Sequence, residues 1–232
     1  MRIYGAGSIE EVKHCTELGA VGILTNPQGF EQFFRGEMTL EEITRALIEA
    51  TDLPVFIQIH GNTVDALVER GWALHGLSPR VGFKIIANEK GFRAIRRLQA
   101  DGISCIATGL FSISQAATAA AVGAFGICPF VARAQDAGID VEWMLETIRA
   151  GYEELSTPPE IIAVSLRSLS DVERALAAGV DAVGMRWPLM QKMFAHPLSD
   201  QAELLFAKNW AKVKGENIEY LHHAMRMEGM AE

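Results

Sequence analysis

The stretch VGFKIIANEKGFRAIRRLQADGISCIAT, residues 81–108, contains a complete strand–helix–strand pattern. Residues 81–86 are almost continuously apolar, which is typical of a parallel strand covered on both faces. The segment 89–100 has helical spacing, and its apolar residues fall near one face: Phe92, Ile95 and Leu98. A glycine follows this segment, as at a helix C-terminus, and a second apolar run ends the stretch. These residues predict one β-α-β unit.

Similar units recur along the chain about every 25 residues. Eight short apolar runs mark the expected strands: residues 2–5, 21–25, 54–59, 81–86, 103–108, 124–129, 161–165 and 182–185. Eight units in one chain of 232 residues favour a (β/α)8 barrel, for which about 250 residues is typical, over an open doubly wound sheet. The sequence predicts an α/β protein with a single TIM barrel in residues 1–197.

Residues 198–232 exceed what closure of the barrel requires. They contain two further stretches with helical spacing, 200–215 and 216–230, with Leu, Met and Trp side chains that need a partner surface. Two arrangements are open. This C-terminal helical extension packs on its own barrel, or it docks on a neighbouring subunit.

The charge balance excludes several classes of function. With 21 Lys and Arg against 29 Asp and Glu, the net charge is −8, so the basic surface that nucleic acids or anionic membranes require is not expected. We find no apolar run long enough for a membrane span or a secretory signal. The three cysteines fit neither a disulfide framework nor a zinc site, which favours a cytoplasmic protein. The same cysteine spacing gives no reason to expect a metal. GAGS at residues 5–8 lacks the GxGxxG pattern, so no nucleotide cofactor is expected.

Active sites of TIM barrels lie at the C-terminal ends of the strands. Lys84 lies inside the run VGFKII, where a lysine is rarely buried without a partner or a purpose. Burial lowers the pKa of a lysine and leaves a neutral amine that can attack a carbonyl and form a Schiff base. Lys84 is therefore a candidate nucleophile. The alternatives are a lysine that reaches a carboxylate inside the barrel, or an amine in water at a strand end.

Two loops carry side chains suited to an anion. Ser165 and Arg167 follow the seventh apolar run, where this fold often binds phosphate, and Arg133 follows the sixth. A hydroxyl and guanidinium groups together suit a tetrahedral oxyanion. They predict an anionic substrate, although a single arginine more commonly forms a surface ion pair.

Four further residues near strand ends have two interpretations each. The amides of Asn26 and Gln58 can orient a polyol, but such amides also commonly satisfy loop backbone. Thr108 can hold a catalytic water or a substrate hydroxyl, or simply end a strand. His60 can act as a general acid or base, although a single histidine is more often structural.

Taken together, these motifs resemble the transaldolase family, and most closely its small bacterial subgroup that includes fructose-6-phosphate aldolase. The resemblance extends over nearly the whole chain. It rests on LTNP at 24–27, FIQI at 56–59, the lysine strand and following helix at 81–103, IATGLFSISQA at 106–116, CPFVAR at 128–133, AVSLR at 163–167 and AGVDAVGM at 178–185. The lysine strand followed by xxGxxAIxxLxxxGI is the most specific of them.

The resemblance implies a class I aldolase mechanism without a cofactor. Lys84 would form a Schiff base with a ketose and hold a dihydroxyacetone unit as an enamine. Asn26 and Gln58 would contact that unit, and Thr108 would help place the catalytic water. The positions that match the family's anion-binding residues are Arg133, Ser165 and, as in some relatives only, Arg167.

At some positions the chain departs from the family pattern. Ala6 stands where relatives have an aspartate that serves as acid and base in carbon–carbon cleavage, which makes His60 the best candidate for a substitute proton carrier. Phe130 stands where the aldolase subgroup has a tyrosine that helps water release dihydroxyacetone. Transaldolases have phenylalanine there, so this position favours transfer over hydrolysis. Gln58, in contrast, is the residue of the aldolase subgroup, where transaldolases have a glutamate.

Two functional hypotheses follow. In the first, the chain is a transaldolase or aldolase that acts on a phosphorylated ketose or on another anionic one, such as a sulfonated sugar. In the alternative, the barrel binds a sugar phosphate without turnover, as a sensor or an assembly partner; Ala6 supports this, whereas Lys84 argues against it. The resemblance also implies a homo-oligomer, a pentamer or decamer as in relatives, with neither nucleic acid nor membrane as a partner.

Overall fold

Eight parallel strands close into a barrel in the computed structural model, which describes residues 1–34 and 36–213. Each strand pairs with its neighbours in chain order, and pairing of the first with the last closes the barrel. The strands are β1 (Arg2–Ala6), β2 (Gly22–Leu24), β3 (Val55–Gln58), β4 (Val81–Ile86), β5 (Cys105–Leu110), β6 (Gly126–Pro129), β7 (Glu160–Ala163) and β8 (Ala182–Arg186). All of them overlap the predicted apolar runs, so the predicted TIM barrel is confirmed.

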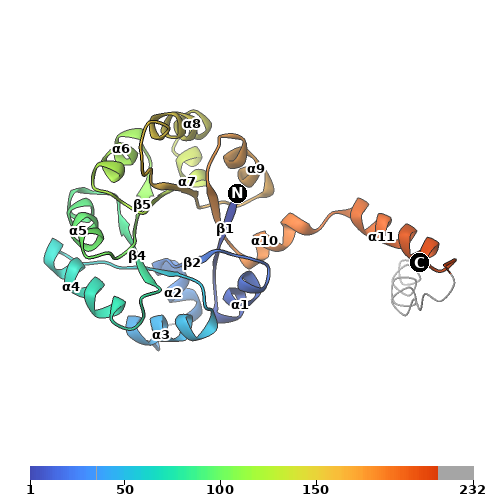
Figure 1. Cartoon of the computed structure of the whole chain (residues 1–232), viewed down its shortest axis with the longest axis horizontal. Coiled ribbons are helices and arrows are strands. Elements are labelled where there is room, and N and C mark those ends of the chain that lie inside the picture. Colours follow the sequence, from blue (N-terminus) through green and yellow to red (C-terminus); the bar gives the residue numbers. More distant parts are fainter. Residues whose placement is uncertain (35, 214–232) are drawn as a thin grey trace. The chain divides into compact units, whose positions relative to one another are not determined.

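Helices α1 to α9 connect the strands and form a ring around the barrel (Figure 1). In the described part of the chain the helices are α1 (Ile9–Glu17), α2 (Pro27–Phe34), α3 (Leu40–Ala50), α4 (Val64–His75), α5 (Glu89–Ala100), α6 (Ile113–Ala121), α7 (Val131–Asp136), α8 (Val141–Tyr152), α9 (Leu169–Ala177), α10 (Trp187–Phe194) and α11 (Pro197–Trp210). Two connections contain an extra helix, α2 after β2 and α7 after β6. Because these helices directly follow strand ends, they lie beside the expected site.

The β4–α5–β5 segment shows how the sequence fixes the strand that carries Lys84. The Asn88 side chain caps α5, because its Oδ1 accepts a hydrogen bond from Gly91 N at 2.8 Å. The apolar face predicted from the sequence is buried in the structure: Phe92, Ile95 and Leu98. A Cβ at Gly91 would overlap the carbonyl oxygen of Ile86. Glycine therefore lets the first turn of α5 pack directly on the end of β4.

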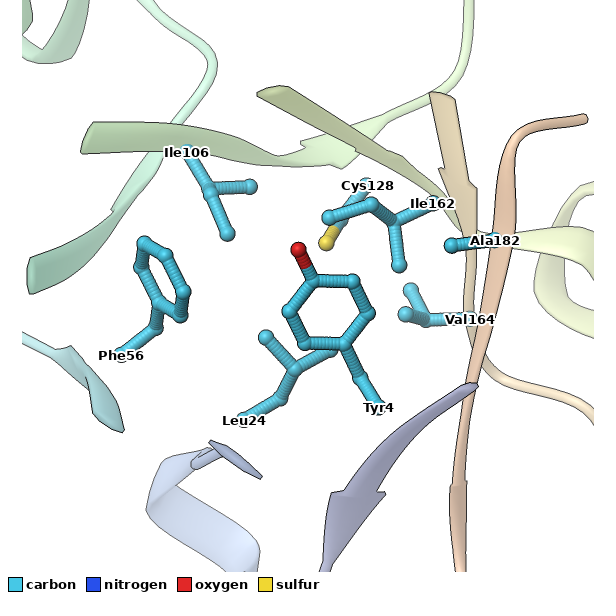
Figure 2. Packing of buried hydrophobic residues seen from close by; sticks show 8 residues of the cluster. All are labelled: Tyr4, Leu24, Phe56, Ile106, Cys128, Ile162, Val164 and Ala182. Carbon is cyan, nitrogen blue, oxygen red and sulfur yellow. The ribbon is translucent and has the colours of Figure 1, made fainter. Parts of the chain in front are cut away.

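Side chains from the strands fill the interior of the barrel (Figure 2). The buried cluster consists of Tyr4, Leu24, Phe56, Ile106, Cys128, Ile162, Val164 and Ala182. Toward the N-terminal ends of the strands, the hydroxyl of Tyr4 leaves this cluster and donates a hydrogen bond to Glu160 Oε2 at 2.7 Å. Arg2 pairs with the same carboxylate at 3.0 Å. These contacts fill the N-terminal end of the barrel, so space for a ligand lies toward the C-terminal ends of the strands.

Contacts divide the chain into two units, Met1–Met190 and Gln191–Glu232. Within the second unit, α11 confirms the helix predicted in the stretch 200–215, and it begins with a proline that follows its N-cap, His196. The predicted helical stretch 216–230 lies outside the described residues, and the boundary between residues 197 and 198 stays a prediction. None of the helices that the structure describes is both long and apolar enough to cross a membrane.

Candidate active site

A cavity of about 680 Å³ opens at the C-terminal ends of the strands. Seven of the predicted site residues line it together: Asn26, Gln58, Lys84, Phe130, Arg133, Ser165 and Arg167. The structure therefore gathers the last residue of β3 and residues that follow β2, β6 and β7 around the lysine of β4. The two remaining candidates, Thr108 and His60, do not line this cavity.

Lys84 combines burial with access to the cavity. Only 4% of the residue is exposed, and its Nζ donates a hydrogen bond to the carbonyl oxygen of Thr25 at 3.0 Å. No carboxylate pairs with it among residues 1–34 and 36–213. Burial lowers the pKa of Lys84, and the nearby Cys128 opposes this effect in part. Lys84 therefore neither reaches a carboxylate nor stands in water, and a neutral amine of this kind can attack a ketone.

Thr25 helps to position the two residues with amide side chains, Asn26, which follows it in the chain, and Gln58 on β3. Its Oγ1 accepts a hydrogen bond from the backbone N of Gln58 at 2.8 Å and so ties the chain after β2 to β3. Gln58 is the register partner of Lys84 on the neighbouring strand. Asn26 Oδ1 accepts a hydrogen bond from a backbone N–H in α2 at 2.7 Å. Asn26 thus satisfies loop backbone with its oxygen, and its NH2 group still has hydrogens to donate to a ligand in the cavity.

Ser165 adopts a strained conformation in the loop after β7. Its φ is +60°, and it is the only non-glycine residue with positive φ in the part of the chain that the structure describes. The backbone N of Ala132, in α7, donates to the Ser165 carbonyl at 3.1 Å and helps hold the loop. Strain of this kind persists where the surroundings enforce it, often at functional sites. The Ser165 hydroxyl is therefore placed at the cavity at a cost in backbone energy.

The two predicted anion-binding arginines differ in their contacts. Arg133 lies over the ring of Phe130, with its Cζ 4.9 Å from the ring centroid. Arg167 forms a bidentate ion pair with Asp136 at 2.6 and 3.0 Å, which holds the pKa of that carboxyl below its usual range. Arg167 thus forms the surface ion pair that the sequence left open, while it also lines the cavity.

Thr108 lies on β5 and is fully buried. Its Oγ1 makes no hydrogen bond of ordinary geometry to any described residue, although it lies near enough to the Cys128 thiol to lower the pKa of that group. Burial raises the pKa of Cys128 to about 11, against the influence of Lys84 and Thr108. A buried hydroxyl with spare hydrogen-bonding capacity fits the predicted role of holding a water, which stays a prediction.

His60 faces a different cavity from Lys84. It is exposed and lines a neighbouring, more apolar cavity of about 520 Å³ together with Arg70 and Lys90. Gln58 lines both cavities, so it forms part of the wall that they share. The structure therefore brings His60 together with Gln58 but not with Lys84 or the predicted anion-binding residues. Its role as a proton carrier stays a prediction.

Arg186 was not among the residues predicted from the sequence. It ends β8, where it is the register partner of Ala6 on β1, and both residues line the Lys84 cavity. Ala6, the position to which the resemblance assigns an aspartate, thus lines the cavity with a methyl group beside a guanidinium. Arg186 directly follows the apolar run 182–185, so the strand-end criterion that found the other residues would also have found this one.

Comparison with known proteins gives the family. The family model described as transaldolase/fructose-6-phosphate aldolase matches residues 7–232. The chain belongs to this family. The "Probable transaldolase 2" of Listeria monocytogenes is 32% identical over 204 residues, which cover 88% of this chain and 92% of that protein. The "Probable transaldolase" of Thermus thermophilus is 31% identical over 222 residues, which cover 92% of this chain and all of that protein.

Solved structures share the fold at much lower identity. The N-acetylmannosamine-6-phosphate 2-epimerase of Clostridium perfringens superposes with a TM-score of 0.54 at 11% identity, over 79% of this chain and 85% of that one. At this identity the likeness shows the barrel alone. The assignment to the transaldolase family therefore rests on the family model and the sequence relatives. These findings confirm the resemblance that the motifs indicate.

Proposed function

We propose that this chain is a Schiff-base transaldolase or aldolase that takes a dihydroxyacetone unit from a phosphorylated or otherwise anionic ketose, a sulfonated one included. The observation that carries the proposal is the buried Lys84 amine. It has no carboxylate partner among the described residues, and arginines line the same cavity. A lowered pKa supplies the neutral nucleophile, and the arginines suit an anionic substrate.

In the proposed reaction, the Lys84 amine attacks the ketone carbon, the carbonyl oxygen leaves as water, and a protonated Schiff base forms. The bond between C3 and C4 then breaks. Its electron pair moves into the iminium to give an enamine, and the C4 hydroxyl loses its proton as the aldehyde departs. In transfer, the enamine attacks an acceptor aldehyde, the aldehyde oxygen takes up a proton, and water hydrolyses the new Schiff base to free the product ketose and the Lys84 amine. In release, the enamine carbon takes up a proton and water hydrolyses the resulting Schiff base to give dihydroxyacetone.

The other cavity residues have roles suited to their contacts. The amides of Asn26 and Gln58 hold the hydroxyls of the dihydroxyacetone unit, and the buried hydroxyl of Thr108 holds the water. The anionic end of the ketose binds to Ser165, Arg133 and Arg167. Phe130 presents a ring without a hydroxyl at the cavity, which favours transfer over hydrolytic release.

Cleavage requires an acceptor for the C4 hydroxyl proton. Ala6 cannot serve, and we propose His60, which lines the neighbouring cavity together with Gln58. A second candidate function is a barrel that binds a sugar phosphate without turnover. Ala6 is the observation that favours it, because a site without a proton acceptor can hold a ketose and leave its carbon–carbon bonds intact.

We also propose a cytoplasmic homo-oligomer, a pentamer or decamer as the resemblance implies. Large apolar side chains on α11 support assembly, because Leu205, Phe206 and Trp210 are 57%, 59% and 51% exposed. Light scattering tests this directly. A monomer at micromolar concentration would contradict the proposed assembly.

The catalytic proposal is tested with fructose 6-phosphate, with and without an aldose phosphate acceptor, by measuring release of glyceraldehyde 3-phosphate. We expect release mainly with the acceptor present, none in Lys84→Met, and a higher rate without acceptor in Phe130→Tyr. Unchanged turnover in Lys84→Met would refute the Schiff base. Binding of the ketose without cleavage, under all conditions and with sulfonated ketoses too, would favour the second candidate.

A further inference from the structure

Arg186 contributes a cation to the substrate cavity. It lies beside Ala6, the position to which the resemblance assigns an aspartate. The residue pairs with Ala6 across β1 and β8. Both also line a smaller adjoining cavity of about 120 Å³, which α2 borders. The alanine leaves open the volume that an aspartate would fill. The guanidinium therefore stands beside unfilled space within the substrate cavity.

The guanidinium is held in place before any ligand binds. Its Nη2 donates to Glu11 Oε1 at 2.9 Å, and its Cζ lies 4.7 Å from the centroid of the Phe33 ring. Glu11 is itself fixed, because its other oxygen accepts a hydrogen bond from Ser8 N at 2.8 Å in the capping box of α1. The Arg186 side chain is nevertheless 43% exposed. Its Nη1 makes only a long hydrogen bond, at 3.5 Å to Gln32 Oε1, so three of the five N–H groups remain for an oxyanion.

Charges around the cavity are one-sided. The described lining residues include three arginines, Arg133, Arg167 and Arg186, and no Asp or Glu, while the buried amine of Lys84 is neutral in the proposed reaction. Arg167 is matched by Asp136 outside the cavity, and Arg186 by Glu11. These carboxylates leave the lining itself positive, because neither of them faces the ligand space. A substrate with a single anionic group would use only one end of this lining.

We infer that Arg186 forms a second anion subsite that binds a carboxylate of the substrate in the space beside Ala6. The substrates would then be carboxylate-bearing ketones, such as sugar acids or oxo acids, rather than neutral or singly phosphorylated sugars alone. The guanidinium edge binds carboxylates and phosphates alike in a bidentate way. A carboxylate is favoured here because the open volume beside Ala6 is the one that an aspartate side chain would fill, and the adjoining cavity measures only about 120 Å³. This inference rests on the proposed Schiff-base function of Lys84.

The test compares ketones that differ in a carboxylate. Pyruvate, 4-oxopentanoate and 5-oxohexanoate place the carboxylate at increasing distances from the carbonyl, and hydroxyacetone and pentan-2-one are neutral controls. Each is trapped on the full-length protein with borohydride, and the concentration for half-maximal labelling of Lys84 is measured by mass spectrometry. We expect at least one oxo acid to label at a ~10-fold lower concentration than the neutral ketones, the effect of a charged hydrogen bond.

Three variants assign the effect to a residue. Arg186→Gln should abolish the preference for the oxo acid and leave labelling by hydroxyacetone unchanged. Glu11→Gln keeps an acceptor for the helix cap but removes the competing charge, so the preference should be kept or increased. Arg93→Gln breaks an exposed ion pair with Glu89 and should change nothing.

Other results would overturn the inference. The inference fails if the wild type shows no preference for any oxo acid over the neutral ketones. It also fails if that preference survives in Arg186→Gln and is lost in Arg133→Gln, because the carboxylate then binds to Arg133. Either result leaves the Schiff base intact, because hydroxyacetone still labels Lys84. Failure of every ketone to label Lys84 would instead refute the proposed function, and the inference with it. Circular dichroism checks folding, and Arg186→Lys, which keeps the charge without the fork, should retain only part of the preference.

Discussion

Ser165 is where backbone strain and the predicted anion site coincide. Its φ of +60° lies in the left-handed region, where a Cβ costs about 1–2 kcal/mol. Backbone hydrogen bonds hold the loop there, from Val164 N to Pro129 O at 3.0 Å and from Ala132 N to Ser165 O at 3.1 Å. We predict that Ser165→Ala and Ser165→Gly separate the strain from the function of the hydroxyl.

Ser165→Ala keeps the Cβ and removes the hydroxyl, whereas Ser165→Gly removes both. Relief of about 1–2 kcal/mol of strain is offset by about 0.4–1 kcal/mol, because glycine has more conformational freedom in the unfolded chain. The glycine variant should therefore be more stable than the alanine variant by about 1 kcal/mol. For a domain of this size the difference corresponds to about 2–4 °C in Tm.

Both variants lack the hydroxyl and should bind inorganic phosphate ~10-fold or more weakly than the wild type, because a hydrogen bond to a charged group contributes about 1.5–3 kcal/mol. Scanning calorimetry measures the stabilities, and isothermal titration with phosphate measures the affinities. An alanine variant as stable as the glycine variant would refute the strain. Phosphate affinity at the wild-type level in both variants would refute the anion site.

Three further predictions concern the lysine, a packed glycine and the histidine. Because burial lowers the pKa of Lys84, the folded state binds fewer protons than the unfolded state, and the lysine costs stability below its ordinary pKa. Lys84→Met should therefore be more stable than the wild type at neutral pH by about 1–3 kcal/mol, and urea titrations should show this gain shrink as pH rises toward roughly 10.4; a constant gain would contradict the buried amine. Gly91→Ala should lower the free energy of unfolding by ~3 kcal/mol or more, because the new Cβ would meet the Ile86 carbonyl oxygen. Gly151→Ala has open space around the new Cβ and should raise the free energy of unfolding by about 0.5 kcal/mol or more. Equal urea midpoints for the two variants would show that α5 does not pack as described. His60→Ala should lower turnover ~10²-fold in a steady-state assay if the imidazole carries the proton, and a loss of only a few-fold would remove it from the mechanism.

The barrel could be predicted because parallel strands covered on both faces leave almost continuous apolar runs, and the alternation of strand and helix then limits the topology. Lys84 could be predicted because it breaks such a run. Its contact with the Thr25 carbonyl could not, since that oxygen lies just after β2, and the sequence does not state the register between β2 and β4. The different contacts of Arg133 and Arg167 were equally hidden, because Asp136 reaches Arg167 only through the fold.

His60 illustrates the limit of the strand-end criterion. Inside a strand, alternation decides which face a side chain takes, and this places Gln58 at the Lys84 cavity. β3 ends at Gln58, so alternation no longer constrains His60, and the loop turns its side chain to the neighbouring cavity. Arg186, in contrast, ends β8 and obeys the criterion.

The role of Lys84 is tested most directly by intact-mass spectrometry after borohydride reduction in the presence of fructose 6-phosphate, followed by peptide mapping. We predict a reduced dihydroxyacetone adduct on Lys84, which disappears when an acceptor aldehyde is added and is absent in Lys84→Met. No adduct with any anionic ketose, or an adduct on an exposed lysine such as Lys13 in its place, would contradict the Schiff-base assignment.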